Sequence, residues 1–121
     1  MRYALLIRED ENVVTGPEER SRRLAALAAF RRGLEERGAL VDSEQLHPAE
    51  TAATVRCWDG GDIVTTNGPF AGAREQITGF AVVDCKDLDE AIDWAARIPT
   101  GCKGAEGCIE IRPLPGLPRN G

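Results

Sequence analysis

The stretch from Gly16 to Gly38 constrains the fold most, because it predicts one long helix near the start of a short chain. Pro17 suits the first position of a helix, and Gly38 is of the type that commonly follows a helix C-terminus. Between them, apolar residues recur at helical spacing and create one face that can pack against a sheet. These residues are Leu24, Leu27, Phe30 and Leu34. We therefore predict a helix over residues 17–37.

Short segments rich in β-forming residues lie on both sides of this helix. They predict strands at residues 2–8, 39–41, 77–85 and 108–112, and a β-hairpin at residues 51–66 with its turn at 59–62. A second helix is expected from Leu88 towards Pro99, with Asp87 as its N-cap. The order β-α-β, hairpin, β-α-β predicts an α+β fold, a ferredoxin-like split βαβ with an inserted β-hairpin. Residues 1–114 form the single predicted domain, and the proline-rich residues 115–121 a flexible C-terminal tail.

Two helices on one face of a sheet leave the other face without a cover. The predicted strands carry apolar residues on both sides, as Leu5 against Leu6 and Val82 against Val83 illustrate. An identical sheet from a second subunit is the usual cover in this topology. The sequence therefore predicts a homodimer.

Charge and hydropathy exclude several classes of partner. The chain has 121 residues with 15 Lys and Arg against 20 Asp and Glu, a net charge of −5. Such an acidic balance argues against direct nucleic-acid binding and against an anionic membrane surface. The longest apolar run spans only residues 24–30, which is far too short to cross a bilayer. A cytoplasmic protein is expected.

The four cysteines form no CxxC pair, and the chain has a single histidine. We therefore expect reduced thiols and no metal site. Cys57 and Cys108 lie in predicted strands, where they are expected to act as small buried hydrophobic residues. No nucleotide-binding, hydrolase or metalloprotease motif is present, so no cofactor is predicted.

The segment Thr65 to Phe80, TTNGPFAGAREQITGF, resembles the signature of the YCII-related family, in the branch named after a DGPF motif. Shorter matching pieces occur in order along nearly the whole chain, from residues 3–7 to residues 109–113. The resemblance implies a dimeric α/β-barrel fold and little defined chemistry. The resemblance also points to a regulatory role, since some DGPF proteins are associated with extracytoplasmic-function sigma factors.

This sequence departs from the family pattern where chemistry matters most. Asn67 replaces the Asp of the motif, and Gly72 replaces a Glu usual in this branch. Leu27 stands roughly where shorter members carry the His of a suggested His and Asp active site. An amide is no general base near neutral pH, although it can hydrogen-bond a ligand in both senses.

Two interpretations of the motif loop remain open. In one, residues 67–70 form a structural turn and Phe70 plugs the core. In the other, the loop borders a cleft in which Asn67, Glu75 and Gln76 converge on a small polar ligand. The candidate pocket residues are Asn67, Gly68, Pro69, Phe70, Glu75, Gln76, His47 and Arg112.

Charged residues elsewhere also have two readings. Arg20, Arg23 and Arg31 lie on or beside the apolar stripe of the first helix, where they either snorkel over apolar surface or bind an anion. Glu110 and Arg112 either form the polar side of the last strand or line a cavity of the dimer.

The leading functional hypothesis is a small dimeric domain that binds a small molecule or acts as a regulatory accessory. The alternative is a cofactor-independent enzyme, of the isomerase, lyase or monooxygenase type, that uses the pocket near Asn67.

Overall fold

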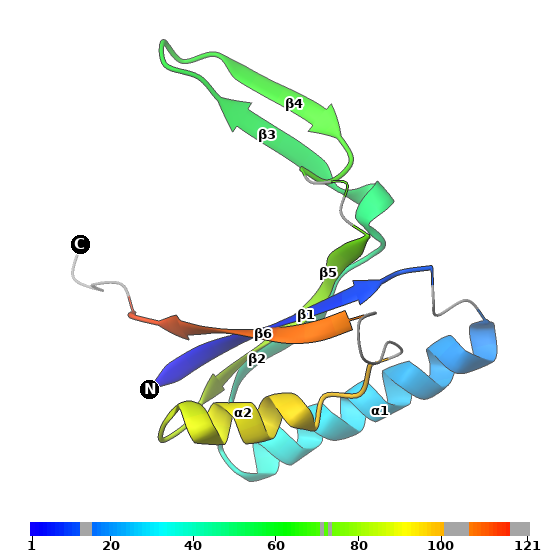
Figure 1. Ribbon diagram of the computed structural model, residues 1–121, viewed down its shortest axis with the longest axis vertical. Coiled ribbons are helices and arrows are strands. Elements are labelled where there is room, and N and C mark those ends of the chain that lie inside the picture. The colour runs from blue at the N-terminus through cyan, green and yellow to red at the C-terminus, as the bar shows by residue number, and fades with distance from the viewer. Residues whose placement is uncertain (13–15, 71, 73, 101–106, 117–121) are drawn as a thin grey trace.

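The computed structural model describes residues 1–12, 16–70, 72, 74–100 and 107–116. Within them the chain forms an α+β fold with two helices and six strands (Figure 1). The elements are β1 (Arg2–Asp10), α1 (Pro17–Glu36), β2 (Leu40–Gln45), the 3₁₀ turn η1 (Ala49–Thr51), β3 (Ala53–Cys57), β4 (Ile63–Asn67), β5 (Glu75–Asp84), α2 (Leu88–Ala96) and β6 (Gly107–Leu114).

The main sheet has four antiparallel strands in the order β2-β5-β1-β6. Both helices lie on the same side of it (Figure 1). This is the strand order expected of a split βαβ pair, so the predicted ferredoxin-like α+β fold is confirmed. Strands β3 and β4 form a separate two-stranded sheet that projects from the opposite side (Figure 1).

The core lies between the sheet and the helices. Alternate residues of β1 point towards the helices, and their cross-strand neighbours on β5 do the same. The largest of the fully buried apolar side chains, Leu5 and Leu34, join the sheet to α1, and Trp94 brings α2 into the same cluster. Phe30 meets Trp94 edge to face with 6.2 Å between ring centroids. Apolar residues of both helices thus pack against the same face of the main sheet.

Both helices begin where the sequence predicts. Pro17 starts α1, Arg37 is its C-cap, and Gly38 follows with a φ of +67°. The Asp87 side chain accepts a hydrogen bond of 3.0 Å from the Glu90 amide and caps α2. One member of the predicted apolar stripe differs, because Leu24 is 58% exposed while Leu34 is fully buried. Only the C-terminal half of α1 packs tightly on the sheet.

Both edge strands, and also the central strand β1, extend beyond their predicted ends. Strand β2 continues through the polar residues 42–45, which pair with β5 on one side only. Strand β6 runs on to Leu114 and includes Pro113, a residue that an edge strand tolerates. An edge strand is paired on one side only, so its sequence can contain polar residues or proline that do not look like a strand. The proposed tail from Pro115 falls largely on residues 117–121, outside the described residues.

One charged pair interrupts the apolar side of the sheet. Glu9 is only 1% exposed, and its carboxylate accepts hydrogen bonds from the guanidinium of Arg23 on α1 and from the hydroxyl of Thr78 on β5. The Arg23 side chain is itself mostly buried. Arg23 therefore extends its side chain over apolar surface as the sequence predicts, and its guanidinium contacts the Glu9 carboxylate.

Removing the arginine should leave the buried carboxylate without its cation. We expect Arg23→Ala to lower the free energy of unfolding by about 3 kcal/mol. Urea denaturation measures this, with the neighbouring exposed residue changed in Arg22→Ala as the control. The double variant Glu9→Gln with Arg23→Leu should recover much of the loss, because it buries no charge. A loss of similar size in Arg22→Ala would contradict this assignment.

Candidate functional site

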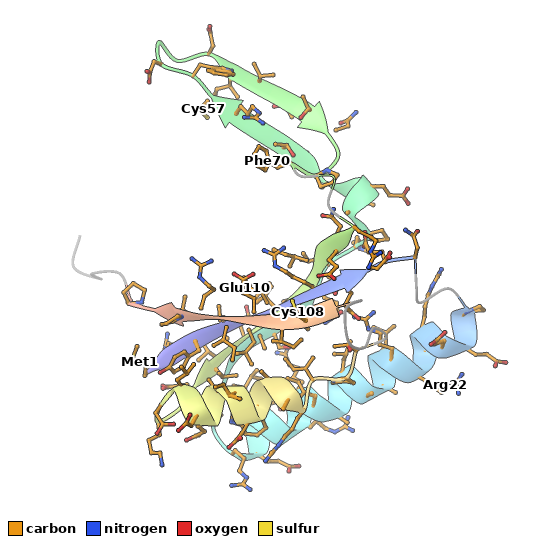
Figure 2. The ribbon with its side chains drawn as sticks, in the orientation of Figure 1. Met1, Arg22, Cys57, Phe70, Cys108 and Glu110 are labelled. Carbon is orange, nitrogen blue, oxygen red and sulfur yellow. The ribbon has the colours of Figure 1, made fainter. Side chains whose placement is uncertain are left out.

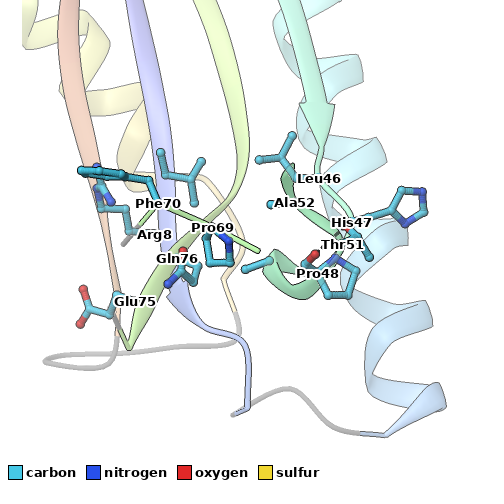
Figure 3. A pocket seen from close by; sticks show the side chains of 12 residues that line it. Arg8, Leu46, His47, Pro48, Thr51, Ala52, Pro69, Phe70, Glu75 and Gln76 are labelled. Carbon is cyan, nitrogen blue, oxygen red and sulfur yellow. Dashed lines mark hydrogen bonds between the residues drawn. The ribbon is translucent and has the colours of Figure 1, made fainter. Parts of the chain in front are cut away.

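A cavity of about 560 Å³ opens beside the root of the hairpin. Its walls are the ends of β1 and β5, the chain around η1, and the segment that leaves β4. Figure 3 places Arg8, Gln76, Pro69 and Phe70 together on one side, and Leu46, Thr51 and Ala52 on the other. The lining residues are Arg8, Leu46, His47, Pro48, Ala49, Thr51, Ala52, Pro69, Phe70, Glu75, Gln76 and Ile77.

The motif loop takes its shape from Gly68. Its φ is +97°, a conformation that side chains rarely adopt. The Gly68 amide donates to the Ala52 carbonyl at 2.7 Å, and the Thr54 hydroxyl donates to the Gly68 carbonyl at 2.8 Å. These bonds close the base of the hairpin and direct Pro69 and Phe70 towards the cavity. The prediction that this segment turns on a glycine is confirmed.

The expectation that Phe70 plugs the core is wrong. Its side chain is 73% exposed, and the ring lies under the guanidinium of Arg56, whose carbon is 4.8 Å from the ring centroid. The reason is the direction of the hairpin, which leaves the sheet on the side opposite the helices (Figure 2). Phe70 follows the hairpin and becomes a wall of the cavity.

Charged residues of β1 and β6 form a chain on the open side of the sheet. The Nε of Arg8 donates to Glu110 at 2.8 Å, and Nη1 of Arg112 donates to the other Glu110 oxygen at 3.1 Å. Hydrogen bonds from Arg8 and then Arg112 lower the pKa of Glu110 below its usual value of 4.5. Two arginines against one carboxylate leave this cluster with a positive balance.

Two further titratable residues sit at the rim of the cavity. The imidazole of His47 points away from Arg8 and Phe70 in Figure 3, and His47 is exposed. The Glu75 carboxylate also points away from Pro69 and Gln76 (Figure 3). The charged group that lies among the apolar walls of the cavity is therefore Arg8, and not an acid and base pair.

The sequence-predicted site residues separate into two groups. The cavity is lined by Pro69, Phe70, Glu75, Gln76 and His47. Asn67 instead ends β4, exposed and paired with Ala53, while Gly68 shapes the turn behind the wall. Arg112 reaches the site only through Glu110.

Sequence reasoning missed Arg8, Leu46 and Ile77 as lining residues. The signal for Arg8 was its place in β1, since residues two apart share a face and Arg8 follows Leu6.

The cysteines occupy different surroundings from those expected. Cys57 and Cys108 are exposed, so the prediction that they are buried is wrong. Cys57 lies on the projecting hairpin and Cys108 on an edge strand, opposite Arg8. Cys85 is buried, and this burial raises the pKa of its thiol, with Glu90 adding to the effect. Cys102 lies outside the described residues, among which no group of three or more potential ligands could hold a metal ion.

Residues 1–115 match the YCII-related domain. The chain belongs to the YCII-related family. An uncharacterised protein of Rhizobium meliloti (strain 1021) is 38% identical over 116 residues, which cover 94% of this chain and 92% of that protein. The match confirms the family that the motif segment indicates. Among the described residues, no helix is long and apolar enough to span a membrane.

The lowered pKa of Glu110 predicts an acid-dependent contribution to stability. A depressed pKa stabilises the fold above the unfolded-state pKa, and this contribution disappears as the pH falls through the folded-state value. Glu110→Gln should therefore lower Tm at pH 7, and the difference from wild type should shrink and then vanish as the pH falls below the usual carboxyl pKa of 4.5 and through the lowered folded-state pKa. Thermal unfolding across this range tests it.

The left-handed backbone at Gly68 predicts that a side chain is costly there. Gly68→Ala should lose roughly 1–2 kcal/mol and speed amide exchange in β3 and β4, because the turn must relax. Gly72→Ala is the matched control, since Gly72 is exposed and a Cβ there meets no atom within 4 Å. Equal behaviour of the two variants would show that the turn conformation is not required.

Proposed function

We propose that this YCII-related chain is a homodimeric binding domain for a small organic anion with an apolar body. The observation that carries the proposal is the cavity beside the hairpin root, where Arg8 meets walls of Phe70, Leu46 and Ile77. A concave, largely apolar site with few polar groups is typical of small-molecule binding.

Arg8 supplies the recognition of charge. Within the described residues, its Nε is the atom bonded to Glu110, so its terminal nitrogens can donate to a carboxylate or similar group. Glu110 holds the guanidinium in place from the far side. The amide of Gln76 adds a group of either hydrogen-bond sense at the same wall.

Binding fits this geometry better than catalysis. The rim residues His47 and Glu75 point away from the wall on which Arg8 lies (Figure 3). Asn67, which replaces the acid of the family motif, stands outside the cavity lining. Cofactor-independent catalysis near Asn67 therefore has less support than recognition at Arg8. A regulatory role of the DGPF type stays a prediction from the sequence resemblance.

The homodimer is supported by the open face of the main sheet. Cross-strand pairs Ala4–Val82 and Leu6–Phe80 lie on the side away from the helices, and all four side chains are only half-buried. Such an apolar stripe on an uncovered sheet is typical of a face that meets a second subunit. Glu110 and Phe70, a residue that lines the cavity, lie on this same side (Figure 2).

A pair of simple probes tests the binding proposal. Phenylacetate should shift the backbone amide resonances of Gln76 and Ile77, and phenethylamine, of similar shape but opposite charge, should bind at least ~10-fold more weakly. Arg8→Gln should abolish the preference for the anion. Arg112→Gln should keep it, because Arg112 does not line the cavity. Equal shifts by both probes, or none at these amides, would contradict the proposal.

A further inference from the structure

The β3–β4 hairpin is a projecting element with little support from the body of its own chain. It shares no hydrogen-bonded strand with the main sheet, and it joins the body through η1 and the Gly68 turn. Four large apolar side chains between Val55 and Val64 are exposed, by 45% to 67%. They are Val55, Trp58, Ile63 and Val64. An isolated two-stranded hairpin is marginally stable in water, so this one needs a surface to cover it.

The exposed apolar residues are arranged for packing. Val55 pairs with Thr65 and Cys57 with Ile63, so Val55, Cys57 and Ile63 share one face of the hairpin. Trp58 adds an aromatic side chain beside the turn. Aromatic and β-branched residues on a projecting ribbon are expected of a contact surface rather than of a solvated loop.

The accessible surface of the chain exceeds that expected of a compact monomer of the same mass. A folded protein of 13.1 kDa is expected to expose about 6,400 Å². This chain exposes 8480 Å², an excess of roughly 2,000 Å². A standard protein–protein interface buries about 800 Å² on each partner, so the excess is enough for a stable dimer.

The position of the hairpin indicates where that contact forms. It projects on the same side of the main sheet as Glu110 (Figure 2). A second chain that packs on the open face would therefore also meet the hairpin. The charges are complementary, because the hairpin turn carries Asp59 and Asp62 while Arg112 projects from the open face with 67% of its side chain exposed. In a two-fold arrangement, each chain offers the same two surfaces to the other.

We infer that the β3–β4 hairpin is a dimerisation arm, which clasps a second copy of this chain against the open face of the sheet. The partner also forms the missing outer wall of the cavity at Arg8 and Phe70, because Phe70, which lines that cavity, lies on the same side. This inference rests on the dimer of the proposed function and assigns the hairpin to its interface.

Two charged substitutions on the arm test the inference. Val55→Lys with Ile63→Lys places cations where the folded chain leaves 57% and 67% of the side chains exposed, so the protomer should stay folded by circular dichroism. We expect the dimer dissociation constant, measured by sedimentation, to rise at least ~100-fold. Leu24→Lys on α1 is the control, since Leu24 is 58% exposed and lies far from the arm in sequence. Its dissociation constant should be unchanged.

Trp58 gives a second readout, which needs only a conservative aromatic variant. The difference spectrum between wild type and Trp58→Phe isolates its fluorescence from that of buried Trp94. We expect this signal to shift to the red, and to become accessible to acrylamide, over the same dilution range in which the mass halves.

The outcomes separate the two proposals. A wild-type dimer whose dissociation constant is unaffected by the double substitution would overturn the arm and leave the dimer standing. A monomer at all concentrations would overturn both. A Trp58 that is shielded in the monomer would also overturn the arm, because the hairpin would then fold on its own chain.

Discussion

Strand β1 has one face buried against the helices and one face open, and both the core and the cavity depend on this alternation. The strand lies inside the sheet between β5 and β6, so its backbone is paired on both sides and its side chains alternate between the two faces. Tyr3, Leu5 and Ile7 point to the helices and are buried. Ala4, Leu6 and Arg8 point the other way, where the described chain supplies no helix.

Each face then determines a different property. The helix side is completed within the chain, and even its charged member, Glu9, is neutralised by Arg23 from α1. A one-residue slip of β1 would exchange Leu5 for Leu6 and place Arg8 inside the core. Burial of Leu5 and Ile7 therefore fixes the position of Arg8 on the open face, and the cavity depends on the same packing that makes the core.

The elements that depend on local chemistry were predictable from the sequence. Pro17 and Gly38 mark the ends of α1, and Asp87 starts α2, because caps and turns are decided by neighbours a few residues away. The edges were less predictable, since the polar end of β2 becomes a strand only through its pairing with β5. Phe70 was misplaced for a similar reason. A Gly-Pro turn shows that the chain bends, but not to which side of the sheet the following residue goes.

The sequence predicted the motif segment of the candidate site but not Arg8, which comes from a distant strand. A sequence motif identifies a segment, and the segment does contribute Pro69, Phe70, Glu75 and Gln76 to the cavity. The cation beside them comes from Arg8, more than sixty residues earlier in the sequence, and strand register brings it there. Replacing the motif acid by Asn67 at the end of β4 changes no lining group, because that position faces outward beside Ala53. The charge that governs ligand choice in this chain is thus carried by the central strand, while the motif supplies the turn and the apolar wall.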